Sequence, residues 1–282
     1  MKFFKSNKIR RDTKRVFLKK GTCSRTFFYI LNREFGHPKE EEEHAADPLA
    51  GGILQQGYQC GMLWGASLAV GAECFRRFGN GGQAVGMAIK ATQHVMESFV
   101  KRTNSADCAD ITSCDFSSKF SIAKYFFSGK FLSCFKLAEK WAPEAIQAAA
   151  EGLSLDQSDL PRQPLSCASE LAKKMGATDE EMVMVAGFAG GLGLSGNACG
   201  ALGAAIWMNT LTRIRRQNYK TSFSDRIAGK ILNALYETTN YEILCSDICG
   251  RCFKTIDEHS EFIKNGGCSD LIDTLVKAGT IE

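Results

Sequence analysis

The chain has 282 residues, of which 44% are hydrophobic, so it can bury a sizeable core and does not have the composition of a disordered protein. Its formal net charge of +4 is uneven: residues 1–20 carry nine lysines and arginines against one aspartate, and the remainder holds 26 basic and 30 acidic residues. Twelve cysteines exceed what packing usually needs, and secreted disulfide scaffolds are normally much shorter. We therefore expect a reducing, cytoplasmic setting with thiols kept for redox or metal chemistry.

The first 20 residues form a basic arm, which we expect to be a solvated or partly disordered helix. Only Phe3, Phe4 and Phe17 interleave with its basic residues, so it lacks the aromatic stacking typical of nucleic-acid binding and no nucleic-acid partner is expected. A scaffold that this arm docks to a membrane or a nucleic acid is a further alternative. Residues 13–19 also look like a variant twin-arginine export signal, but charged residues interrupt the run that should follow it. Export is therefore not expected.

Apolar spacing predicts helices along the first half of the chain. The expected helices run from Cys23 to about Gly36, from Cys60 to Arg77, from Gly82 to about Lys101, and from Cys134 to about Ala150. The acidic run 40–43 is expected to be a solvated turn, and 106–111 a turn that carries Cys108.

The second half begins after an irregular, proline-containing stretch between Gly152 and Ser166. Further helices are predicted from Cys167 to Gly176, from a capping box at Thr178 and Glu181, from Cys199, over 225–238, and from Cys268. Alternating runs rich in valine and isoleucine are missing, so we predict an all-α fold.

A glycine-rich stretch is present twice, at 50–66 and 189–205. Without a gap the two copies share eight of seventeen residues at an offset of 139, which indicates an internal duplication. We therefore expect a basic arm over 1–20 and two tandem helical units, 21–152 and 153–282, each with a glycine-rich turn before a core helix. The two units are expected to pair within the chain.

The second copy of this stretch contains two patterns that suggest other functions. Residues 182–212 carry no charge, but seven of them are glycines and the first copy holds glutamines at equivalent depth, so no transmembrane segment is expected. Residues 191–196 match the G-x-G-x-x-G of dinucleotide-binding folds, which must follow a strand. A helical pattern precedes them here, so nucleotide binding is not expected.

The cysteines recur in the same order in both copies. The matched pairs are Cys23 with Cys167, Cys60 with Cys199, Cys108 with Cys245, and Cys134 with Cys268. Gly57 and Gly196 lie three residues before Cys60 and Cys199, where a tight turn would bring each cysteine to a helix N-terminus. The helix dipole and exposed N–H groups there favour a thiolate. A cysteine that merely packs helices closely is the other interpretation.

A single cysteine, then Cys-Gly-Ala-x-x-Gly after a glycine-rich turn, then two more single cysteines resembles the C-GCAxxG-C-C family of redox-active proteins. The second copy has Cys199-Gly200-Ala201-Leu202-Gly203-Ala204, with its last glycine one place early; the first keeps Gly61 and Gly65 but has Met62 in place of the alanine. The resemblance implies a helical unit and a redox role for the four cysteines of each copy, and it names no substrate.

Two kinds of chemistry would use these cysteines: electron transfer through an iron–sulfur cluster, or a thiol/disulfide couple, either of which would make the protein an oxidoreductase or electron carrier with a partner protein. The alternative is a non-catalytic module held by structural zinc or static disulfides. The candidate redox residues are the eight matched cysteines. The glycines Gly57, Gly61, Gly196 and Gly200 would shape a cofactor site, and the candidate metal ligands are Cys167, Cys199, Cys245, Cys249, Cys252 and Cys268.

Cys245, Cys249 and Cys252 have the spacing of the radical-SAM triad. That triad belongs near the start of a barrel, and only thirty residues follow Cys252, so radical-SAM chemistry is not expected. The triad is instead interpreted as extra cluster ligands or as a Cys-Gly-Arg-Cys dithiol.

Overall fold

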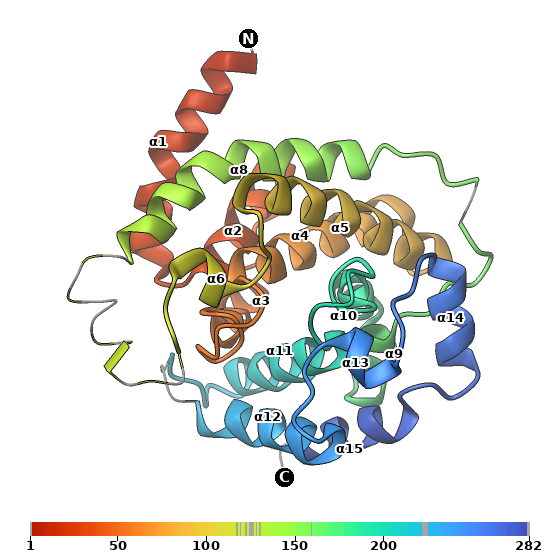
Figure 1. The fold of residues 1–282 in the computed structure, drawn as a ribbon. Helices are drawn as coiled ribbons and strands as arrows, with labels where there is room; N and C mark the ends of the chain where they lie inside the picture. The colour runs from red at the N-terminus through yellow and green to blue at the C-terminus, as the bar shows by residue number, and fades with distance from the viewer. Residues whose placement is uncertain are drawn as a thin grey trace.

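A computed structural model describes residues 2–116, 118, 120–121, 123, 127, 129, 131–158, 160–221 and 225–280, without the side chains of 2–8, 10 and 11. Within these ranges the regular elements are all helices, and the only strand-like pairing is an isolated bridge between Gln59 and Asp107. The all-α prediction is therefore confirmed (Figure 1).

The first copy follows the helices expected from its apolar spacing. Its elements are α1 (Lys2–Lys20), α2 (Cys23–Phe35), α3 (Glu40–Ala45), the 3-10 turn η1 (Asp47–Leu49), α4 (Gly61–Phe78), α5 (Gly82–Thr103), α6 (Cys108–Thr112) and α8 (Leu132–Gly152). Helix α2 begins behind the cap residue Thr22 and ends at Gly36, whose φ of 89° is readily accessible to glycine. Cys60 is the N-cap of α4.

The acidic run at 40–43 is not the solvated turn that we expected, because it forms helix α3. Glu43 is fully buried and accepts hydrogen bonds from Asn32 Nδ2 at 3.1 Å and from the Lys39 amide at 2.9 Å, and Lys20 lies 3.4 Å from its other oxygen. A buried carboxylate needs such partners. The prediction was wrong because these groups come from three separate places in the sequence.

The second copy repeats the order of helices found around the first glycine-rich stretch. Its elements are α9 (Cys167–Lys174), α10 (Asp179–Met184), the 3-10 turn η2 (Ala186–Phe188), α11 (Gly200–Arg215), α12 (Arg226–Thr239), α13 (Cys245–Cys249), α14 (Ile256–Lys264) and α15 (Ser269–Gly279). The capping box of Thr178 and Glu181 is present at the start of α10. Helix α14, which begins after Thr255, was not predicted from the sequence.

The basic arm forms α1, but it is not solvated along its whole length. From Ile9 onward its apolar side packs against α8, where Phe17 is buried and its ring centroid lies 4.4 Å from that of Phe135. The predicted helix is confirmed, but the prediction that it is solvated was wrong for the part from Ile9 onward, which packs against α8 (Figure 1).

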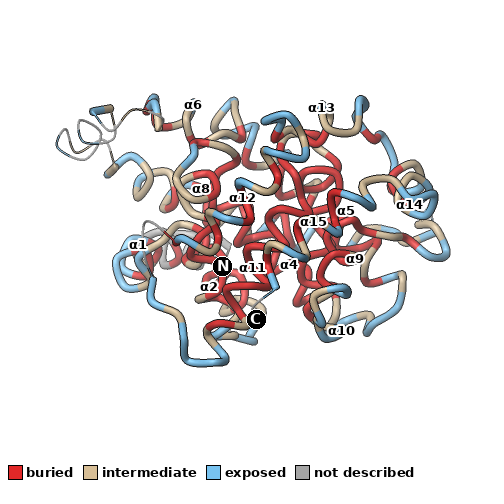
Figure 2. Tube along the Cα trace, turned by 90° about the horizontal axis from the view of Figure 1, so that it is seen from below, coloured by how far each residue is buried: buried red, intermediate tan, exposed pale blue. Residues whose placement is uncertain are grey.

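The two copies exchange equivalent segments. Helix α3 of the first copy packs on the core helix α11 of the second, and α10 of the second packs on the core helix α4 of the first. One continuous set of buried apolar residues therefore runs through both copies, and the tube in Figure 2 is buried along α4 and α11. Among the described residues no helix is both long and apolar enough to cross a membrane.

Candidate functional site: two cysteine sites behind left-handed turns

Each glycine-rich stretch forms a left-handed turn, at 51–55 and 190–194. Five successive residues have positive φ in each, between 51° and 75° in the first and between 56° and 87° in the second. Non-glycine residues pay about 1–2 kcal/mol each for this conformation. Yet Ile53 and Leu192 adopt it while fully buried, at φ 58° and 68°. Burial of these side chains offsets the backbone strain, and the turn is kept in both copies.

The end of each turn is hydrogen-bonded to the short helix that carries the third cysteine. The carbonyl of Gly57 accepts from the Ala109 amide at 2.9 Å, and the carbonyl of Gly196 accepts from the Ser246 amide at 3.0 Å. Gly57 and Gly196, with φ 84° and 78°, therefore link the turn to α6 and α13 respectively. Both of these helices lie along the same edge of the molecule in Figure 2.

The first-copy cysteine site comprises Cys23, Cys60, Cys108 and Cys134. Cys23 and Cys60 are close enough that their interaction lowers the pKa of the Cys23 thiol and raises that of Cys60, and Cys108 is close enough to Cys23 and Cys134 to interact with them electrostatically. A Cβ atom on Gly61 would lie 2.6 Å from Cys23 Sγ, so only glycine at this position allows that sulfur to approach the start of α4.

The second-copy cysteine site comprises Cys167, Cys199, Cys245, Cys249 and Cys268. Cys249 Sγ lies 3.6 Å from Cys268 Sγ and 3.8 Å from Cys245 Sγ, while Cys167 and Cys199 are near enough to interact electrostatically with Cys249. No disulfide is formed between the described cysteines. The structure thus brings together the four cysteines expected in each copy and adds Cys249 to the second set.

Backbone amides point at the sulfurs that lie at helix starts. Cys23 accepts from the Gly51 amide and Cys167 from the Gly190 amide, each from the left-handed turn of its own copy. These hydrogen bonds favour the thiolate, but burial dominates at Cys167 and Cys199 and raises their thiol pKa values to about 11 and about 12. The helix N-terminus therefore does not make Cys199 a thiolate, contrary to expectation.

Cys249 is the one cysteine of the second-copy site whose thiol pKa is lowered instead of raised. Hydrogen bonds from Cys245 and Cys268 lower the pKa of its thiol, and the same contacts raise the pKa of both donors. Arg251 adds a positive charge. Burial lowers the pKa of His259 to about 4, so this imidazole is neutral at pH 7, hydrogen-bonded through Nδ1 to the Leu165 carbonyl at 3.2 Å. The sulfur contacts and Arg251 thus account for the thiolate character of Cys249.

The remaining cysteines lie apart from these contacts or at their edge. Cys74 is buried in α4, and burial raises the pKa of its thiol. Cys114 is buried near Cys108. Cys252 is exposed and lies beside Gly196, since a Cβ atom on Gly196 would be 3.1 Å from Cys252 Sγ. Among the described residues, no sulfur contact joins Cys252 to Cys249. The Cys-Gly-Arg-Cys dithiol is thus not assembled, and the close pair is Cys249 with Cys268.

The chemistry of the donor set suits iron–sulfur clusters or zinc, because thiolates are ligands that both accept. Its arrangement does not: among the described residues no group of three or more histidine, cysteine, aspartate or glutamate side chains is placed to hold a metal ion. A Cβ atom on Gly200 would lie only 1.9 Å from the carbonyl oxygen of Phe188 and would clash with it. Close backbone packing therefore requires glycine at this position.

Residues between the two sites were missed by sequence reasoning. Gln59, next to Cys60, donates through Nε2 to the Gly191 carbonyl at 3.2 Å in the other copy's turn, and its own carbonyl accepts from Trp64 Nε1 at 3.3 Å. The Tyr58 and Tyr236 hydroxyls also hydrogen-bond across the copies. The only available signal was that the aligned position of Gln59 is the apolar Ala198.

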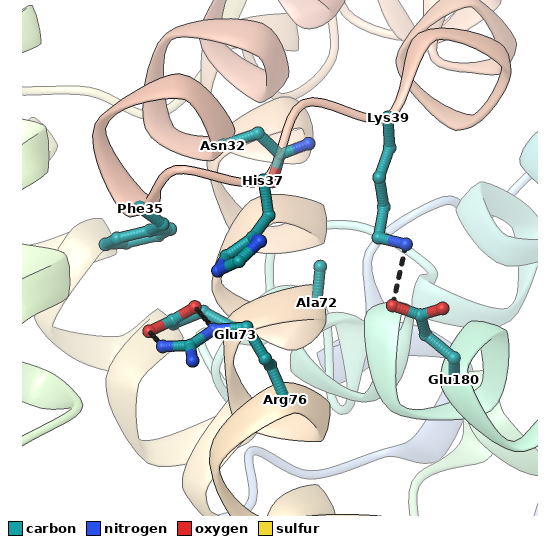
Figure 3. A pocket seen from close by; sticks show the side chains of 8 residues that line it. All are labelled: Asn32, Phe35, His37, Lys39, Ala72, Glu73, Arg76 and Glu180. Atoms are coloured by element: carbon teal, nitrogen blue, oxygen red, sulfur yellow. Dashed lines mark hydrogen bonds and ion pairs between the residues drawn. The ribbon is translucent and has the colours of Figure 1, made fainter.

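A separate cavity of about 150 Å³ lies where α2, α4 and α10 meet, and Figure 3 shows its lining. Lys39 pairs with Glu180 at 2.8 Å on one side, and Glu73 is bound by Arg76 within α4. No cysteine lines it, and its charged groups are already paired with one another. The ion pair between Lys39 and Glu180 connects the two copies, and the cavity is not part of either cysteine site.

Comparison with known families gives a match to the family described as "Putative redox-active protein (C_GCAxxG_C_C)", over residues 22–147 and again over 166–279. No curated protein and no solved structure matches the chain. Each matched range contains the four cysteines and the left-handed turn of one copy. The chain therefore belongs to the C-GCAxxG-C-C family of redox-active proteins, and it contains two tandem copies of the family's unit.

Proposed function

We propose that this protein transfers electrons in pairs through a dithiol/disulfide couple formed by Cys249 and Cys268. The observation that carries the proposal is the contact of their sulfurs at 3.6 Å, with both side chains only half-buried. The other three sulfurs matched to the first copy, those of Cys167, Cys199 and Cys245, are buried, so they are less accessible to a partner.

The reaction balances as a two-electron exchange with a partner disulfide. The two thiols lose two electrons and two protons and form one S–S bond, while the partner's S–S bond breaks and its two sulfurs become thiols. The partner is therefore a disulfide in one direction and a dithiol in the other, and no further oxidant is needed. In this role the protein is an oxidoreductase or an electron carrier.

Cys268 is a better bonding partner for Cys249 than Cys245 is. Cys245 and Cys249 lie one turn apart on the five-residue helix α13, so a bond between them would have to distort that helix. Cys268 lies outside α13, at the N-cap of α15, where the preceding loop can follow a small shift. Cys245 then acts as a hydrogen-bonding neighbour of the couple.

The first copy offers a second couple of the same kind, Cys23 with Cys60, whose thiols are close enough to shift each other's pKa. Cys60 is buried and Cys23 is half-buried, so exchange with a partner there requires more opening than in the second copy. We infer that the second copy reacts first. Thiol chemistry of this kind fits a reducing compartment such as the cytoplasm.

A metal-based centre is the second candidate, because each copy carries four matched cysteines; it would require their side chains to move closer together than they are here. Cys167, Cys199, Cys245, Cys249 and Cys268 would supply the ligands, and amides such as that of Gly190 would hydrogen-bond to their sulfurs. A bound cluster would supply one-electron transfer. Structural zinc or static disulfides without turnover is the third reading of the same residues.

Anaerobic purification separates these readings. We would measure iron and zinc content, visible absorption and free thiols before and after mild oxidation. The dithiol proposal expects no stoichiometric metal and a loss of two thiols, regained on reduction, with peptide mapping that joins Cys249 to Cys268. Cys252→Ser, which removes an exposed thiol, is the control and should leave this loss unchanged. A coloured iron-containing protein, stoichiometric zinc, or an unchanged thiol count would each overturn the proposal.

A further inference from the structure

A cavity of about 650 Å³ opens beside Cys268, between the ends of α12, α13 and α15. Its size is that of a pocket for a small organic molecule. Cys268 lines it and Cys249 does not. A molecule in this cavity would therefore meet one sulfur of the Cys249–Cys268 couple directly, with the other sulfur 3.6 Å behind it.

The walls of this cavity carry charge of a single sign. Glu242, Asp247 and Asp270 line it, and no lysine, arginine or histidine does. Glu242, Asp247 and Asp270 are exposed, and none of them forms an ion pair within the part of the chain that the structure describes. Their charge is thus available to a ligand.

Apolar and neutral polar groups complete the lining. Ile248, Phe262 and Leu271 provide an apolar surface, and threonine, serine and asparagine side chains provide neutral hydrogen-bonding groups. A ligand that fits has a short hydrocarbon portion near its sulfur and a positive charge a few ångströms away. A carboxylate-bearing disulfide would be repelled by Glu242, Asp247 and Asp270.

We propose that this cavity is the substrate site of the couple, and that it takes small cationic disulfides and thiols of the aminothiol class. The proposal rests on the dithiol function proposed above and specifies its substrate. It also assigns the order of events: Cys268 exchanges with the substrate, and Cys249 exchanges with Cys268.

The two steps balance as follows. Cys268 passes its proton to the Cys249 thiolate, 3.6 Å away, and attacks one sulfur of the substrate disulfide, so that a mixed disulfide forms and the first aminothiolate leaves. Cys249 then attacks Cys268 Sγ, which closes the Cys249–Cys268 bond and expels the second aminothiolate. The two products take up the two protons that the couple releases. Two electrons pass from the protein to the substrate.

Three disulfides of similar length test the charge preference: cystamine, which is cationic, 2-hydroxyethyl disulfide, which is neutral, and 3,3′-dithiodipropionate, which is anionic. We would measure the rate at which each oxidises the reduced full-length protein, at low and at high salt. The triple variant Glu242→Gln, Asp247→Asn, Asp270→Asn removes the charge and keeps the side-chain shapes.

At low salt, the ratio of the cystamine rate to the dithiodipropionate rate is expected to be about tenfold higher in the unmodified protein than in the triple variant. Salt should reduce the difference, because the charges are exposed. A matched control, Glu40→Gln with Glu97→Gln and Glu151→Gln, neutralises three exposed carboxylates elsewhere and should leave the ratio unchanged. Equal ratios in the unmodified protein and the triple variant would overturn the proposal.

The order of events has its own test in Cys249→Ser, which cannot complete the second step. After cystamine treatment, peptide mass mapping should find the aminothiol attached at Cys268, and an adduct found only at other cysteines would contradict the assignment. The two proposals fail differently. If no disulfide of any charge oxidises a Cys249–Cys268 pair, the dithiol function itself is wrong; if all three do so without a charge preference, only the substrate class is wrong.

Discussion

The two copies share one scaffold and differ in the surroundings of their half-buried sulfurs. Both have a left-handed turn that ends on the third-cysteine helix, through Gly57 and Ala109 in one copy and Gly196 and Ser246 in the other. Each copy has two half-buried cysteines, Cys23 and Cys134 in the first and Cys249 and Cys268 in the second. Cys249 and Cys268 are in contact at 3.6 Å, and Cys268 lines an acidic cavity. Duplication thus preserved the backbone that gathers the cysteines, while the second copy gained its close sulfur pair from Cys249, which aligns with Thr112 of the first copy.

We expect the largest effect from removing a cysteine of the proposed couple, and the same kind of substitution in the first copy should have none. Cys268→Ser should abolish the reversible loss of two thiols on mild oxidation, because Cys249 then lacks its nearest bonding partner. Cys114→Ser, the comparison in the first copy, should leave the loss intact, because Cys114 lies in the other site. Thiol titration with peptide mapping measures both. Loss of the signal in Cys114→Ser, or its survival in Cys268→Ser, would show that we chose the wrong copy.

The left-handed turns should be equally sensitive to substitution in both copies. A Cβ on Gly52 would lie 2.3 Å from the Tyr58 carbonyl, and one on Gly191 would lie 2.5 Å from the Ala198 carbonyl. Gly52→Ala and Gly191→Ala should each lower the free energy of unfolding by about 3–5 kcal/mol, through overpacking added to backbone strain.

Gly176→Ala is the control for these two substitutions. Gly176 also has a positive φ, 82°, but a Cβ there meets nothing within 4 Å, so the loss should be about 1 kcal/mol. Denaturant unfolding measures all three variants. Equal losses at the three positions would mean that the close contacts within the turns contribute nothing.

His259 should make stability depend on pH through the second copy. Its folded pKa is about 4 against an ordinary value of 6.5, because burial disfavours the charged imidazole. The unfolded chain therefore takes up this proton first as the pH falls, and stability is lost between about pH 6.5 and pH 4, by about 3 kcal/mol in total. Unfolding measured across this window should show a flatter profile in His259→Asn. An unchanged profile would place the pH dependence on other groups.

The smallest expected effect comes from making the first copy resemble the second at Gln59. Gln59→Ala introduces the residue that the second copy has at Ala198 and removes the hydrogen bond to the buried Gly191 carbonyl. The free energy of unfolding should fall by about 1–2 kcal/mol. Ala198→Ser, a small change at the matched position, is the control and should cost less. A stability gain in Gln59→Ala would show that this bond does not hold the two turns together.

Sequence patterns accounted for much of the secondary structure and for the grouping of the cysteines. Apolar spacing identified α2, α4, α5 and α11 because each buries a stripe at helical period. The repeated Cys-Gly pairs identified Cys60 and Cys199 as helix starts. The acidic helix α3 and helix α14 were missed, since their stability depends on contacts with distant residues such as Asn32 and Leu165.

The sequence by itself determined that the chain is helical, duplicated and built around four recurring cysteines per copy, because helical period and internal repetition are local signals. Only the tertiary structure decided that α3 and α10 are exchanged between the copies, that five residues of each turn are left-handed, and that Cys249 lies against Cys268. These depend on packing between segments far apart in sequence. Nineteen residues separate Cys249 from Cys268, and only the folding of α13, α14 and α15 against one another brings their sulfurs together.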